Sequence, residues 1–114
     1  MNRNDHTRLS HMIEASQDAR SFLYGKSLNE LQDDRQLAFA VVRALEIVGE
    51  AASQISQELR DRYPNIKWRD IISMRNKLIH AYFDINYNII WTAVQEDIPK
   101  LIPELKKILG EYGS

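Results

Sequence analysis

The sequence predicts an all-α protein, an antiparallel bundle of four to five helices that forms a single domain over residues 1–114. Two observations support this prediction. Only 4 Gly and 3 Pro occur in 114 residues, so few positions interrupt regular backbone structure. Apolar residues recur every three or four positions along nearly the whole chain, which is the period of an amphipathic helix.

The first helix is predicted to begin at a cap on Asn4 or Asp5 and to end at Gly25. Ser27 and Glu30 then have the spacing of a capping box, in which two side chains satisfy backbone N–H groups at a helix start. A new helix is therefore expected to begin at Ser27. The side of the first helix that is expected to be buried is formed by Leu9, Met12, Ile13, Ser16, Ala19 and Leu23, with Phe22 beside it.

The longest amphipathic stretch predicts one continuous helix from about Leu37 to Leu59, ended by Tyr63-Pro64-Asn65. Small residues widen its apolar stripe, so that it can contact two neighbours. This helix is expected at the centre of the bundle and at a contact between two copies of the chain. Its apolar positions are Leu37, Val41, Leu45, Val48, Ala52, Ile55 and Leu59.

A shorter helix is predicted from about Trp68 to His80 or Tyr82. Residues 84–88, which follow it, are expected to form a turn. The apolar residues of this helix are Ile71, Ile72, Met74, Leu78 and Ile79.

The last apolar stretch, from Ile89 to Leu109, also has a helical period. It contains Pro99 and Pro103. Because proline has no N–H to donate to the preceding turn, a break or kink is expected near residues 97–103.

Composition excludes several classes of function. Without Cys, the chain has no disulfide scaffold, no Cys-ligated zinc or iron–sulfur centre and no thiol nucleophile. No apolar run approaches the roughly 18 residues that a membrane span needs, and residues 1–5 are too polar for a signal peptide. We therefore expect a cytoplasmic protein with no membrane partner.

Charge is distributed unevenly although the net charge is only -1. Residues 60–77 hold six basic and two acidic groups. A phosphate chain responds to the local potential within a Debye length of roughly 8–10 Å, so RNA could bind this basic band. A solvated charged face is the alternative. Tyr63 and Trp68 lie within the band, where they could stack on bases or pack in the core. The basic residues are Arg60, Arg62, Lys67, Arg69, Arg75 and Lys77.

The stretch that follows Met74 contains the groups that RNA cleavage by the 2′-hydroxyl needs. The imidazole of His80 suits proton transfer near neutral pH, and the guanidinium of Arg75 suits paired hydrogen bonds to a phosphate. Asn76 lies four positions before His80, so on one helix its amide could orient the ring. Lys77 adds a second cation. This chemistry requires no metal and no cofactor.

Each of these residues also has a purely structural interpretation. His80 could end a helix by binding its last carbonyl groups. Glu46 and Glu50, one helical turn apart, could approach the site or pair along their own helix. His6 and His11 are five positions apart and do not share a helix face, so we expect surface residues rather than metal ligands.

Several separated segments resemble the HepT-like toxins of the HEPN superfamily: 43–51, 68–72, 74–76, 80–82, 90–91 and 97–99. The resemblance covers nearly the whole chain. It implies a helical homodimer in which two Arg-x4-His segments line one cleft, and a metal-independent endoribonuclease. The Arg and His of the motif correspond to Arg75 and His80, and Asn76, Lys77 and Glu46 are expected to support them.

The resemblance also implies a regulatory partner. In HepT systems a minimal nucleotidyltransferase antitoxin attaches AMP to the Tyr two residues after the His, which is Tyr82 here. Each AMP would add a bulky anion that competes with RNA for the cation-lined cleft. The alternative is a non-catalytic helical module that binds nucleotide or regulates a nucleotidyltransferase. In that case Arg75 and Lys77 would hold phosphate and His80 would be structural.

Overall fold

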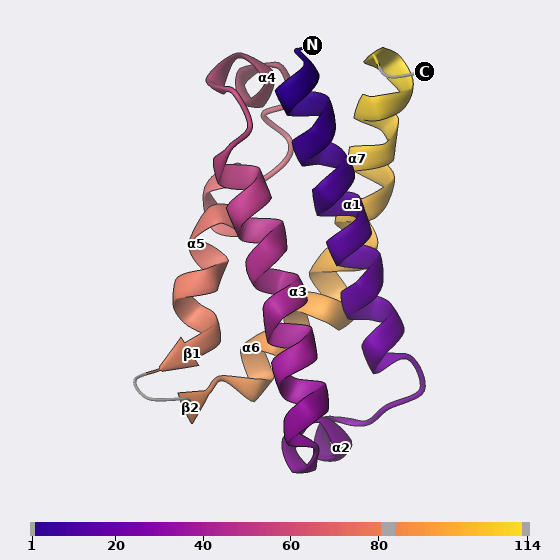
Figure 1. The fold of residues 1–114 in the computed structure, drawn as a ribbon, viewed down its shortest axis with the longest axis vertical. Coiled ribbons are helices and arrows are strands. Elements are labelled where there is room, and N and C mark those ends of the chain that lie inside the picture. Colours follow the sequence, from indigo (N-terminus) through magenta and orange to yellow (C-terminus); the bar gives the residue numbers. More distant parts are fainter. Residues whose placement is uncertain (1, 81–83, 113–114) are drawn as a thin grey trace.

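The computed structural model describes residues 2–80 and 84–112 and shows an antiparallel, all-α bundle (Figure 1). Its centre is α3 (Arg35–Ser53), which lies between α1 (Arg3–Leu23) and α5 (Trp68–Leu78). The last helix, α7 (Ile98–Tyr112), packs along the other side of α1. The predicted all-α class and the central place of the long helix are confirmed.

The N-cap of the first helix lies two residues before the earlier of the two predicted positions, Asn4. Asn2 caps α1, because its Oδ1 accepts a hydrogen bond from the Asp5 N–H at 2.7 Å. The carboxylate of Asp5 has a different role: it accepts hydrogen bonds from the N–H of Ser56, at 2.8 Å, and from its hydroxyl. The end of the helix agrees with the prediction, since α1 stops at Leu23 and Gly25 has a positive φ of 74°.

A short second helix, α2 (Leu28–Asp33), starts where the capping box predicts. The Ser27 hydroxyl accepts from the Glu30 N–H at 3.1 Å, and the Glu30 carboxylate accepts from the Ser27 N–H at 3.2 Å. Asp34 then caps α3 by accepting a hydrogen bond from the Leu37 N–H.

The prediction of one continuous helix to Leu59 is wrong. The chain forms α3 and then a separate short helix, α4 (Gln57–Arg62), which is capped by Ser56. Arg60 stabilises the break, because its guanidinium donates to the backbone carbonyls of Ser53 and Ile55 at 3.0 and 3.1 Å. Ile55, within the break, and Leu59, in α4, are both buried, so the apolar period continues through it.

The α5 helix ends at Leu78, earlier than predicted. Ile79 is extended, with φ −131° and ψ 123°, and β1 (Ile79–His80) pairs antiparallel with β2 (Asp84–Ile85). The N–H of Asn86 donates to the Leu78 carbonyl at 2.8 Å, so this last carbonyl is satisfied outside the helix. Residues 84–88, predicted as a turn, contain β2 and the start of α6 (Tyr87–Thr92).

The predicted irregularity in the C-terminal segment lies earlier than residues 97–103. A π-helical turn, η1 (Ala93–Asp97), joins α6 to α7, and the Ile98 N–H donates to the Ala93 carbonyl five residues back. The wide turn comes just before Pro99, whose ring would clash with a carbonyl in a regular helix. Pro103 lies inside α7.

The core consists of two apolar clusters stacked along the bundle. Trp68 belongs to one of them and is 7% exposed, and its indole N–H donates to the Tyr63 carbonyl at 3.1 Å. It therefore packs in the core and is not available for stacking on bases. Within residues 2–80 and 84–112, no helix has both the length and the apolar character that crossing a bilayer requires.

Candidate functional site

Arg75 is positioned by a close approach of α3 and α5. A Cβ added to Gly49 of α3 would lie 3.2 Å from the Ile71 carbonyl oxygen and 3.9 Å from the Arg75 Cβ. Because glycine has no side chain, the two helices can pack at this short distance. The exposed side chain of Arg75 therefore starts beside α3, at the edge of the bundle.

The neighbouring face of α3 carries a charged cluster. Nη1 of Arg43 lies 3.9 Å from a Glu46 carboxylate oxygen and 3.3 Å from a Glu50 oxygen. All three side chains are substantially exposed to solvent, so each ion pair contributes about 1 kcal/mol or less. Glu46 and Glu50 thus pair along their own helix. A supporting role for Glu46 beside Arg75 stays a prediction.

The two cations of the motif lie on different sides of α5. Successive residues of an α-helix are rotated by about 100°, so Lys77 is about 200° from Arg75. Lys77 lines a groove on the side of α5 that faces α6, whereas the Cβ of Arg75 lies beside Gly49. Asn76, between them, is exposed. Arg75 and Lys77 of one α5 helix therefore do not point toward a common phosphate.

His80 lies beyond the end of α5. Its backbone belongs to β1 and pairs with Asp84 of β2. The prediction that Asn76 and His80 share one helix face is wrong, because the chain is already extended at Ile79. Strand geometry, and not helical periodicity, positions His80. Tyr82 lies outside the described residues.

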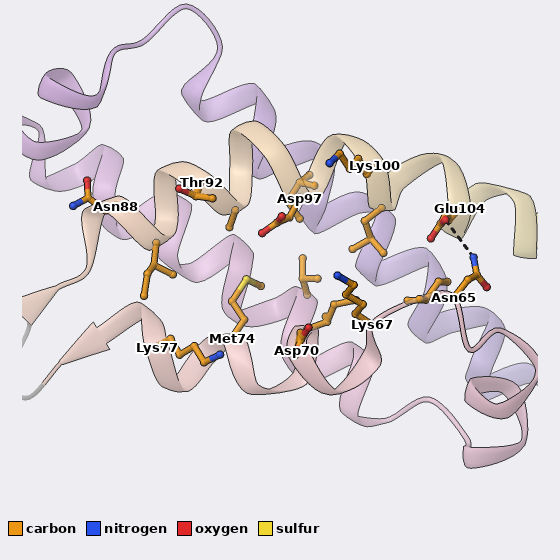
Figure 2. Close-up of a pocket in the computed structure, with 17 residues that line it drawn as sticks. Asn65, Lys67, Asp70, Met74, Lys77, Asn88, Thr92, Asp97, Lys100 and Glu104 are labelled. Carbon is orange, nitrogen blue, oxygen red and sulfur yellow. Dashed lines mark hydrogen bonds between the residues drawn. The ribbon is translucent and has the colours of Figure 1, made fainter.

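The structure contains a groove that the sequence does not reveal. It has a volume of about 760 Å³ and runs between α5 and the segment formed by α6, η1 and α7 (Figure 2). Its apolar lining includes Ile66, Ile71, Met74, Ile89, Ile98 and Leu101. One side of α5 and its N-cap contributes residues at helical spacing to the groove: Lys67, Asp70, Met74 and Lys77. This spacing is the feature of the sequence that points to a shared face. The spacing of these residues does not show that a groove separates this side of α5 from α7.

The other residues that the sequence analysis considered for metal or RNA binding lie at the surface or have structural contacts. His6 and His11 are exposed on α1. In the described part of the chain, no three His, Asp or Glu residues form a group that could hold a metal ion. Arg60, counted in the basic band, is bound to backbone carbonyls, whereas Lys67 and Arg69 are exposed.

Comparison with known protein families identifies the chain. The family model described as ribonuclease HepT-like matches residues 12–108, from α1 to α7. The chain belongs to the HepT-like ribonuclease family. The resemblance found in the sequence is thereby confirmed, and the matched region of this HepT-like chain contains Arg75, His80 and Tyr82.

Two curated relatives of this HepT-like chain match it over most of their length. It is 38% identical to the protein named "Putative RNase MJ1380" of Methanocaldococcus jannaschii, over 83% of this chain and 87% of the relative. It is 45% identical to "Probable ribonuclease HepT" of Thermococcus cleftensis, over 66% and 68% of the two chains. No solved structure matches it significantly.

Proposed function

We propose that this HepT-like ribonuclease is a metal-independent endoribonuclease that cuts RNA with Arg75 and His80. The observation that carries the proposal is the family match over residues 12–108, which includes both residues. Two features of the fold support it. Arg75 is exposed beside α3, and the β1–β2 pairing holds His80 just beyond the end of the same helix.

The proposed reaction uses the RNA's own 2′-hydroxyl. The 2′-oxygen bonds to phosphorus while the bond to the 5′-oxygen breaks, which leaves a 2′,3′-cyclic phosphate and a 5′-hydroxyl. An imidazole accepts the proton of the 2′-hydroxyl, and a second imidazole donates a proton to the 5′-oxygen. The Arg75 guanidinium stabilises the charge on the non-bridging oxygens.

The need for two imidazoles supports a homodimer. Each chain supplies one His80, so a cleft between two copies would hold both a base and an acid, together with two Arg75 guanidinium groups. Asn76 of α5 and Glu46 of α3 would support this cleft, and Lys77, which lines the groove on the other side of α5, would contact the RNA backbone outside it.

The cleavage proposal is tested with total RNA and three variants of the full chain. Arg75→Ala and His80→Ala are each expected to lower the cleavage rate by about 10²- to 10⁴-fold, because each removes a group that acts in the transition state. Arg69→Ala is the control, since Arg69 is an exposed cation of the same helix. Fragments are analysed for a terminal 2′,3′-cyclic phosphate.

Two results would contradict this assignment. Undiminished cutting by both Arg75→Ala and His80→Ala would show that the site lies elsewhere. Cutting that stops when EDTA removes divalent cations would show that the mechanism depends on metal.

The proposed biological setting is a toxin–antitoxin pair in the cytoplasm. The cognate minimal nucleotidyltransferase would transfer AMP from ATP to the Tyr82 hydroxyl and release pyrophosphate. Tyr82 follows His80 by two positions, so the added anion would compete with RNA at the cation-bearing site.

The modification is tested by mass spectrometry of this chain after incubation with the cognate nucleotidyltransferase and ATP. The wild type is expected to gain mass in AMP units and to lose cleavage activity, and Tyr82→Phe is expected to do neither. Tyr24→Phe is the control, because Tyr24 is strongly exposed but far from the site in sequence. Equal labelling of Tyr82→Phe and wild type would rule out Tyr82 as the target.

A further inference from the structure

The groove of Figure 2 combines an apolar interior with polar groups at its edges. Met74 of α5 points into it, and Ile71 and Leu101 contribute to its walls. Asn88 and Thr92 of α6 line the end near Lys77. A volume of about 760 Å³ is within the range of small-molecule sites, roughly 300–1,000 Å³.

Two opposite charges face the groove from its two walls. Lys67, at the start of α5, and Asp97, in η1, both point into the space between the walls (Figure 2). Among the residues that the structure describes, neither side chain has a hydrogen bond or an ion pair. Both groups are therefore available to a ligand that lies between them.

The charges that line the groove balance one another. Three lysines, Lys67, Lys77 and Lys100, are matched by Asp70, Asp97 and Glu104. The amide of Asn65 already donates to the Glu104 carboxylate at 3.2 Å. A balanced lining does not favour a phosphate chain, which attracts cations alone. It favours a flat heterocycle that carries donors and acceptors on one edge.

We propose that this groove binds a guanine base of the RNA next to the phosphate that is cut; the proposal rests on the ribonuclease function proposed above. Asp97 accepts hydrogen bonds from N1–H and N2–H of guanine, and the Lys67 ammonium donates to O6. Met74 and Ile71 contact the face of the ring.

The choice of guanine follows from the donors and acceptors on the bases. Guanine alone presents two adjacent donors, which match the two oxygens of one carboxylate, beside an acceptor for a cation. Adenine and cytosine place a ring acceptor next to their single amino group, and that acceptor would face the Asp97 carboxylate. Uracil has one donor between two acceptors. A carboxylate therefore binds these three bases less well.

One lining residue of the groove, Met74, directly precedes Arg75 in the chain. The two residues lie on the groove side and on the α3 side of the same helix, respectively. Single-stranded RNA can turn a base away from its backbone, so one nucleotide can place its phosphate at Arg75 and its base beside Met74. Lys77, at the groove edge, can contact the backbone between them.

The test compares Asp97→Asn with Glu96→Gln in the full chain. Glu96 is an exposed carboxylate of the same π-helical turn and does not line the groove. The cut sites in a random RNA library are mapped by sequencing the fragment ends. Wild type and Glu96→Gln are expected to prefer guanine beside the cut, and Asp97→Asn to lose this preference by about fivefold or more while still cutting.

A binding measurement separates this proposal from the cleavage proposal. GMP and AMP are titrated against the full chain by ligand-observed NMR, which needs no cutting. Wild type is expected to bind GMP at least about fivefold more tightly than AMP, and Lys67→Met and Asp97→Asn to lose the difference. Lys106→Met is the control for charge, since Lys106 is exposed on α7 outside the groove.

Several outcomes would overturn the inference. One is RNA cutting with the same base preference in Asp97→Asn as in wild type. Another is equal binding of GMP and AMP. A change of oligomeric state in Asp97→Asn, measured by sedimentation, would show that the groove is a protein contact instead. If wild type binds GMP selectively but cuts no RNA, the groove assignment stands and the cleavage proposal fails.

Discussion

Gly49 sets the distance between the two helices that carry the charged residues of the candidate site. Its missing side chain leaves room for the backbone of α5 at Ile71, and this contact also places the Cβ of Arg75. A larger residue at this position has to displace backbone atoms, which cannot move as easily as the end of a flexible side chain. Stability and the position of Arg75 are therefore coupled at one residue.

We expect Gly49→Val to lower the free energy of unfolding by about 1–3 kcal/mol, because its methyl groups would overlap the α5 backbone. Cleavage activity should fall as well, since α5 carries Arg75. Urea denaturation and a cleavage assay measure the two effects. Gly110→Val is the matched control: a Cβ at Gly110 meets no atom within 4 Å, so its effect should stay within about 0.5 kcal/mol. Equal effects of both variants would contradict the role of the α3–α5 contact.

Asp5 shows how one distant side chain changes a local prediction. It lies 51 positions before Ser56 and is 3% exposed. Its carboxylate binds both the N–H and the hydroxyl of Ser56, and the same hydroxyl caps α4. A buried charge-assisted pair of this kind contributes about 1.5–3 kcal/mol. The start of α4 is therefore held by the first turn of the chain.

The short β-hairpin is the element that determines the position of His80. Its two-residue strands pair Ile79 with Ile85 and His80 with Asp84. A two-stranded pairing of this length is not stable alone. It is stabilised by burial of Ile85, which is 8% exposed and belongs to the core cluster around Leu78.

We expect Ile85→Ala to lower the free energy of unfolding by about 2–4 kcal/mol, because it removes buried apolar atoms and leaves a cavity. The cleavage rate measured below the unfolding transition should also fall, since the strand that carries His80 loses its support. Asp84→Ala, an exposed change in the same strand, is the control and should affect stability by less than about 0.5 kcal/mol. Full activity in folded Ile85→Ala would argue against positioning by the hairpin.

The whole molecule is almost neutral, with a net charge of -1, but basic residues are concentrated in the stretch 60–77. The basic residues of the α4–α5 region include exposed Lys67, Arg69 and Arg75, while Arg60 is bound to backbone carbonyls. The cations near the proposed cleavage site therefore come chiefly from α5. A net charge of -1 is compatible with an RNA substrate because the local potential acts over roughly 8–10 Å.

We expect the protein to be a homodimer, because the proposed reaction needs an acid and a base and each chain supplies one His80. Sedimentation equilibrium should give twice the mass of the chain. In mixtures of wild-type and His80→Ala subunits the cleavage rate should follow the share of wild-type homodimers, since a mixed cleft retains only one of the two imidazoles. A monomer that cuts RNA at full rate would contradict the two-imidazole scheme.

The helical class, the main apolar positions of the helices, the capping box at Ser27 and the family could be predicted from the amino-acid sequence, because these depend on local periodicity, local hydrogen bonds and short motifs. The position at which the long helix breaks and the end of α5 depend instead on tertiary contacts. In both cases the deciding partner is distant along the chain or in another element: Asp5 for Ser56, and β2 with Asn86 for the end of α5.

For the candidate site, too, the sequence predicted the set of residues, whereas their arrangement depends on tertiary packing. The sequence brought Arg75, Asn76, Lys77, His80 and Tyr82 together as a motif, and the functional roles of all five remain predictions. The tertiary structure decided that Arg75 lies beside α3, that Lys77 faces the groove and that His80 is in a strand. The physical reason is that helical periodicity gives directions around one element, whereas the packing of its neighbours determines what each direction faces.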